Sequence, residues 1–249
     1  MFKPINRACK NLFALAPPLK TNPIMDDFRA FMQEETYSFS ARYAKTRVII
    51  HGDQHLLSAI TQKSVILAFL HYGSFFLTGG ALHHQLNIPY TAIASRRNIQ
   101  LLPANEKLFW QGVHTRSGKL YEEPLIFTDE SALKSIRWLT KHQHVLGVAL
   151  DVHEIEYPKK RLPFSFLGQR VYLPIGAARL AKLTSTPMMP ACIQFDPILK
   201  VHHLYLNEVV VVNEPLQATQ ACLDALAPFV QSNPSQQFFD IAQAFANPI

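Results

Sequence analysis

Residues 65–74 read VILAFLHYGS, six apolar residues followed by a polar corner. A short apolar run bounded by turn residues is typical of a strand buried on both faces, as the strands of parallel sheets are. Gly73 and Ser74 favour a turn, and the residues after them predict a helix that extends to about His84. The stretch therefore predicts a strand followed by a helix, the repeating unit of α/β proteins.

The same alternation continues on both sides of this stretch. No linker interrupts it, so we expect one α/β domain over residues 1–249, with a central mixed, largely parallel sheet flanked by helices. The expected strands are Arg47–His51, Tyr90–Ala94, Val145–Leu150, Pro187–Phe195 and one or two strands within Val201–Val212. The expected helices are Met25–Tyr43, 54–62, 130–141, Gly176–Leu183 and 217–230.

The composition also suits a single globular domain. Of the 249 residues, 48% are hydrophobic and 17% are charged, which is too apolar for a disordered chain.

The charge and the cysteines bear on partners and compartment. The chain has 24 Lys and Arg residues and 18 Asp and Glu residues, and the net charge of +6 favours an anionic partner such as nucleic acid, anionic lipid or an acidic carrier protein. The three cysteines lie far apart, which predicts neither a disulfide framework nor a cysteine zinc site and suits a reducing compartment.

The amino-terminal residues carry the features that bear on membrane binding. The longest apolar run is far shorter than the ~20 residues that span a bilayer, so we expect no transmembrane helix, and no signal-peptide pattern is present. Residues 1–20 place apolar side chains at roughly helical spacing, with Lys3, Arg7 and Lys10 between them. This segment is expected either to lie on a membrane surface or to pack against the domain as a short helix.

Two of the expected strands end in ionisable residues. His71 follows the strand at 65–70, and Asp151 follows the strand at 145–150, with His153 and Glu154 just beyond it. Functional groups of open α/β sheets gather beyond the carboxyl ends of the strands. These four residues are therefore the candidate catalytic groups, and a structural turn or a solvated loop is the alternative for each.

Five short motifs, in this order and spacing, resemble the lipid A late-acyltransferase branch of the lysophospholipid acyltransferase superfamily. The resemblance extends from about Arg47 to Phe245. The motifs are HYGSFF at 71–76, VALD at 148–151, FSFLGQR at 164–170, LPIGAARLA at 173–181 and TPMMP at 186–190. The resemblance implies an acyltransferase-like fold and places no metal ion or bound cofactor in the site.

The family's His-x4-Asp/Glu pair is incomplete in this chain. In the family, the His removes a proton from the acceptor hydroxyl, and the carboxylate orients the ring. Phe76 stands at the position of the acid, and no Asp or Glu occurs between Asp53 and Glu106. Adjacent parallel strands lie about 5 Å apart, so Asp151 is the first candidate for a replacement carboxylate, and His153 with Glu154 form a second possible pair.

The resemblance also implies substrate contacts. Arg96 and Arg97 correspond to a segment that holds phosphate or head-group oxygens, for which the bidentate guanidinium is suited, and a solubilising surface is the alternative. Gly73, Ser74 and Arg170 are the other expected binding residues. We expect backbone N–H groups after the strand at 65–70 to stabilise the oxyanion. Gly79 and Gly80, within the next expected helix, are expected to allow close packing.

Without the acid, with no membrane helix and with its basic charge, the chain resembles the lipid A glycyltransferases of carrier-protein-dependent aminoacylation. The resemblance implies transfer of glycine from a phosphopantetheine thioester on an acidic carrier protein to a hydroxyl of lipid A, a change that confers polymyxin resistance. It implies a peripheral protein at the cytoplasmic face of the inner membrane that does not bind nucleic acid. A fatty-acyl transferase and a catalytically inactive lipid-binding protein of the same fold are the alternatives.

A glycyl group and a fatty-acyl group make different demands on the site. The glycyl group carries an ammonium, which a carboxylate such as Asp151, Glu154 or Glu156 would hold. A fatty-acyl group needs a long apolar groove instead.

Overall fold

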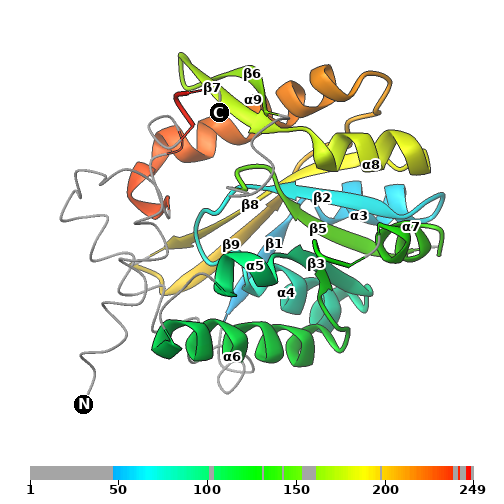
Figure 1. Ribbon diagram of the computed structural model, residues 1–249, viewed down its shortest axis with the longest axis vertical. Helices are drawn as coiled ribbons and strands as arrows, with labels where there is room; N and C mark the ends of the chain where they lie inside the picture. The colour runs from blue at the N-terminus through cyan, green and yellow to red at the C-terminus, as the bar shows by residue number, and fades with distance from the viewer. Residues whose placement is uncertain are drawn as a thin grey trace.

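The computed structural model describes residues 47–100, 104–130, 132–141, 143–152, 161–196, 198–237, 241 and 245–247 (Figure 1). The expected amino-terminal segment at 1–20 and the expected helix at Met25–Tyr43 lie outside the described residues. His153 and Glu154 also lie outside them.

Seven strands of the described chain form one sheet. Their bounds are β1 Val48–His51, β2 Val65–Phe69, β3 Tyr90–Ala94, β4 Ile126–Phe127, β5 Val145–Ala149, β8 Met188–Asp196 and β9 Val201–Leu206. Their order across the sheet is β1-β9-β8-β2-β5-β3-β4. The strands from β8 to β4 run parallel, whereas β9 is antiparallel to β8 and parallel to β1. The expectation of a single α/β domain with a mixed, largely parallel sheet is confirmed.

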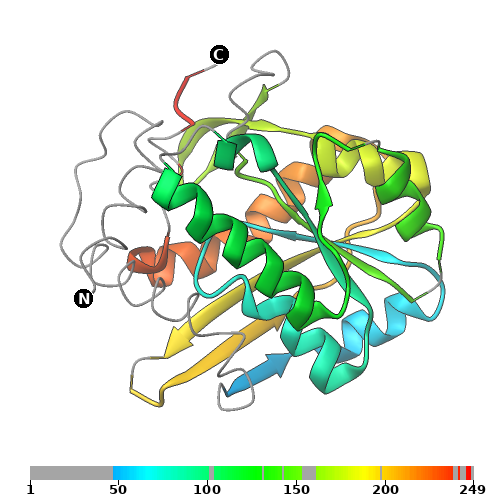
Figure 2. The same ribbon diagram turned by 60° about the horizontal axis from the view of Figure 1, so that its bottom comes forward.

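Helices cover both faces of the sheet (Figures 1 and 2). One face packs against α3 Asp53–Ile60, α4 Leu77–Leu86 and α6 Ala104–Tyr121, and the other against α7 Leu133–Leu139, α8 Gly176–Thr184 and α9 Pro215–Ser232. Within β2, Val65 and Leu67 contribute to the core under α3 and α4, whereas Ile66 and Ala68 contribute to the core under α8 and α9. The continuous apolar run at 65–70 therefore fills two cores at once.

The long helix α6 was not expected from the sequence. Its inward positions follow helical spacing, but they include Ser117, and Gly112 and Gly118 interrupt the pattern. Short helix α5, Arg96–Gln100, precedes it and packs against it. Of the described helices, none is long and apolar enough to cross a membrane.

The FSFLGQR motif lies in a separate hairpin, which was also not expected. Strands β6 Arg161–Phe166 and β7 Gln169–Pro174 pair antiparallel, and the turn residues Leu167 and Gly168 both have positive φ. That conformation is typical of two-residue hairpin turns. Close packing at Gly79 is confirmed, because a Cβ there would collide with the ring of Tyr90.

Candidate active site

His71 and Asp151 meet at the carboxyl ends of two neighbouring strands. Strands β2 and β5 pair with Phe69 opposite Ala149, so each of the two residues lies two positions beyond a paired residue. Nδ1 of His71 lies 2.8 Å from Oδ1 of Asp151. The backbone N–H of His71 also donates to the same carboxylate, at 3.1 Å from Oδ1 and 2.9 Å from Oδ2. The expected contact between the two residues is confirmed.

This contact determines which nitrogen of His71 can act as a base. The Asp151 side chain is fully buried, whereas 29% of the His71 side chain is exposed. Since the buried carboxylate accepts the proton on Nδ1, the lone pair of the neutral ring resides on Nε2. The same carboxylate would stabilise the imidazolium that forms when Nε2 takes up a proton. Asp151 thus lies where it could supply the carboxylate that the resemblance expects and the HYGSFF motif lacks.

Aromatic side chains surround the imidazole. The Phe75 ring meets the His71 ring edge-on, with 5.0 Å between centroids, and Phe75 also packs on Phe76 at 4.0 Å. Phe76 in turn lies 6.1 Å from the Trp110 ring. Phe76, which stands where the resemblance places an acid, is therefore part of an apolar wall.

An apolar cavity of about 230 Å³, here called the inner cavity, lies beside the His71–Asp151 pair. One wall is formed by β3 and β5, and the other by a face of α6 that carries Trp110, His114, Ser117 and Tyr121. From Tyr90 to Ser95 along the strand wall the distance is about 16 Å. From Trp110 to Tyr121 along the helix wall it is also about 16 Å. The inner cavity is thus elongated, with the catalytic candidates at the end where the strands terminate.

These α6 residues were not identified from the sequence as candidates for a functional site. Their spacing of three to four residues does place them on one helix face, but two of the four are polar. Burial and the nearby Arg96 cation lower the pKa of His114 to about 4, so the imidazole is neutral near pH 7.

Lowering the pH from 7 to 4 is expected to destabilise the fold through His114. In the unfolded chain this residue takes up a proton near pH 6.5, and in the folded protein only near pH 4. Between these values the unfolded state binds more protons than the folded state. The contribution of His114 to the free energy of unfolding is therefore at its full value above pH 6.5 and is lost as the pH falls to 4. Its size is about 3 kcal/mol. Urea unfolding at several pH values should show a flatter profile for His114→Phe, and parallel profiles would contradict this burial.

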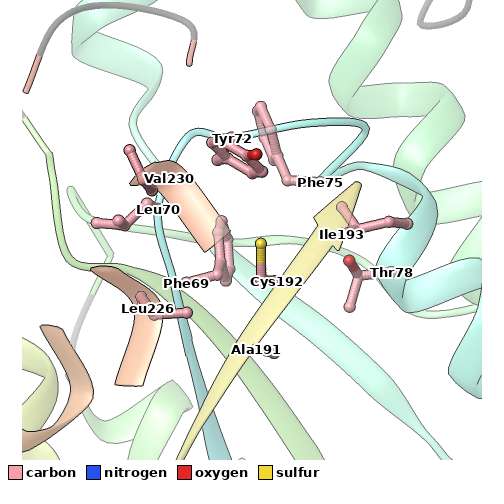
Figure 3. A pocket seen from close by; sticks show the side chains of 10 residues that line it. All are labelled: Phe69, Leu70, Tyr72, Phe75, Thr78, Ala191, Cys192, Ile193, Leu226 and Val230. Carbon is pink, nitrogen blue, oxygen red and sulfur yellow. The ribbon is translucent and has the colours of Figure 1, made fainter. Parts of the chain in front are cut away.

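A tight apolar layer supports the corner from the opposite side (Figure 3). Phe69, Tyr72 and Phe75 pack there against β8 and α9, leaving a void of only about 10 Å³, roughly the space of one water molecule. The Tyr72 hydroxyl lies 3.0 Å and 2.9 Å from the carbonyl oxygens of Phe229 and Asn233. This layer holds the His71 backbone in place.

Gly73 and Ser74, two of the expected binding residues, are buried outside the lining of the inner cavity. Gly73 has φ of 55°, and a Cβ there would collide with the carbonyl oxygen of Ile193. Ser74 is buried, and neither residue lines the inner cavity. Among the backbone N–H groups after β2, which are expected to stabilise the oxyanion, those of residues 71, 72 and 73 donate to Asp151, Leu70 and Gln236 respectively.

Arg96 is already paired with two carboxylates. Its guanidinium donates to Asp129 at 3.2 Å and to Glu130 at 3.1 Å, and it lies 3.7 Å above the Phe127 ring. A phosphate at this position would face two carboxylates, so the expected head-group contact of Arg96 is not supported. The backbone of Arg97 lies in α5, and its side chain is outside the described structure. Arg170 is exposed on β7 and does not line the inner cavity.

No protein-family model matches the chain, and a search of curated proteins finds no significant match. Within the described part of the chain, no group of three or more His, Cys, Asp or Glu side chains is arranged to hold a metal ion. Cys192 and Cys222 are buried, and burial raises the pKa of both thiols, that of Cys222 to about 12. The fold and the site together define an α/β protein with a buried-carboxylate–histidine pair beside an apolar cavity.

Proposed function

We propose that this chain is an acyltransferase that moves an apolar acyl group from a thioester to a hydroxyl. The observation that carries the proposal is the position of the His71–Asp151 pair at the end of an elongated apolar cavity. A base oriented by a buried carboxylate suits activation of a hydroxyl, and an adjacent apolar cavity suits an acyl chain.

In the proposed reaction, the proton of the acceptor hydroxyl passes to Nε2 of His71. The hydroxyl oxygen forms a bond to the thioester carbonyl carbon, and the carbon–sulfur bond breaks. The departing thiolate takes the proton from the imidazolium, which restores the neutral ring. Asp151 holds the ring in position and balances its positive charge while the proton is bound.

The lining of the inner cavity favours an apolar acyl group over a glycyl group. Of the described residues that line it, only Asp151 is acidic, and both of its oxygens accept hydrogen bonds from His71. The ammonium of a glycyl group would have no further carboxylate there. A dry cavity of ~150 Å³ can hold a benzene molecule, so about 230 Å³ suits an acyl chain of roughly nine carbons.

The other partners follow from the resemblance. An anionic glycolipid such as lipid A is the proposed acceptor, and an acidic carrier protein with a phosphopantetheine thioester is the proposed donor. The net charge of +6 supports both, as well as peripheral binding at the cytoplasmic face of the inner membrane.

The test uses purified full-length protein, a lipid A precursor and carrier-protein thioesters of glycine, octanoate, decanoate and hexadecanoate. Mass spectrometry of the lipid is expected to show an octanoyl or decanoyl increment as the main product. A glycine increment would instead assign the protein to the aminoacylating enzymes. If folded protein forms no product from any donor, the inactive lipid-binding alternative holds.

A further inference from the structure

A second cavity lies against a neighbouring face of α6. This open groove of about 770 Å³, here called the outer groove, is lined mainly by polar and charged residues of α6 and of the segment that follows it. Ile99, His114 and Leu125 line both the outer groove and the inner cavity. These three side chains therefore belong to the boundary of both spaces.

His114 occupies the boundary position on α6. Trp110, Ser117 and Tyr121 line the inner cavity alone, whereas Thr115 and Lys119 line the outer groove alone. Helical geometry places residue 114 at the edge between these two faces.

The Phe127 ring, which lines the outer groove, packs against the His114 ring at a tilt of 52°. The two ring centroids lie 5.5 Å apart, and the carboxylate-bound guanidinium of Arg96 is stacked on Phe127. Among the described residues, no hydrogen bond engages either ring nitrogen of His114. An alkyl chain pressed against this ring would bury polar nitrogens without giving them a partner, which is unfavourable.

We propose that His114 determines the length of the acyl group by closing the inner cavity toward the outer groove. The inference rests on the proposed function for the identity of the ligand. An acyl chain that runs from His71 toward the outer groove ends at the imidazole, and a longer chain on this path meets both a steric and a desolvation barrier. With a small side chain at 114, the end of a longer chain would continue into the outer groove.

Binding measured without turnover tests this inference separately from catalysis. Trp110 lines the inner cavity, while the chain's other tryptophan, Trp138, lies in the core on the opposite face of the sheet. Bromine atoms quench tryptophan only at close contact, so brominated decanoic and hexadecanoic acids can be titrated against full-length protein. A Trp110→Phe variant identifies the part of the signal that comes from the inner cavity.

Wild-type protein is expected to bind the decanoic probe at least about tenfold more tightly than the hexadecanoic probe. His114→Ala should reduce this ratio about tenfold or more, because the longer chain gains room. His114→Phe, which keeps a ring of similar size, should retain the preference for the short probe. Thr115→Ala, which alters the outer groove alone, is the matched control and should leave the ratio unchanged.

An unchanged ratio in folded His114→Ala would overturn the inference, as would equal binding of the two probes by wild-type protein. If neither brominated probe quenches the tryptophan fluorescence of wild-type protein, the inference is overturned as well. If the ratio shifts as expected but no thioester donor gives a product, the length determinant stands and the proposed acyl transfer is wrong.

Discussion

His71→Ala is expected to lower the rate of acyl transfer about 10²- to 10⁴-fold while leaving the fold intact, because the general base is lost. The imidazole is partly exposed, and its removal leaves the Asp151 carboxylate with the backbone N–H of residue 71. Steady-state kinetics with the decanoyl donor measure the effect, and circular dichroism checks the fold.

Asp151→Asn should also lower turnover strongly, since the amide keeps the size of the side chain but removes the charge that stabilises the imidazolium. Asp129→Asn is the matched control, because this carboxylate is exposed and binds Arg96 instead of His71. Full activity in a folded His71→Ala variant would sink the catalytic assignment. Equal losses in Asp129→Asn and Asp151→Asn would show that the effect is not specific to the pair.

Gly73→Ala is expected to be the most destabilising of the conservative single substitutions at this corner. The left-handed backbone costs an alanine about 1–2 kcal/mol. Relieving the collision with the carbonyl of Ile193 costs typically a further 1–3 kcal/mol, because the obstacle is backbone. We therefore expect a loss of roughly 2–5 kcal/mol in the free energy of unfolding, measured by urea titration.

Gly168 provides the control for this measurement. It also has positive φ, but a Cβ there would meet nothing within 4 Å. Gly168→Ala should therefore carry only the backbone cost, about 1–2 kcal/mol. If the two variants lose the same stability, the close approach of Gly73 to β8 is not what makes glycine necessary there.

Local sequence determined most of the regular elements. The runs at 65–70 and 145–150 are apolar throughout because their strands are buried on both faces, and this pattern is visible without knowledge of the partners. Helix α6 is different, because its inward face lines a cavity. Where a helix packs against a core, the side chains on its inward face are apolar. On the inward face of α6, polar residues such as His114 and Ser117 interrupt this pattern.

The sequence by itself identified His71 and Asp151 as strand-end residues, and the family resemblance predicted an acid where Phe76 stands. Only the tertiary structure made β2 and β5 neighbours, and this pairing brings a carboxylate from 80 positions away to the imidazole. The same kind of long-range contact pairs Arg96, an expected substrate-binding residue, with carboxylates 33 and 34 positions along the chain. Local pattern determines which segments become strands and helices, whereas charge partners and cavity walls depend on which segments pack together.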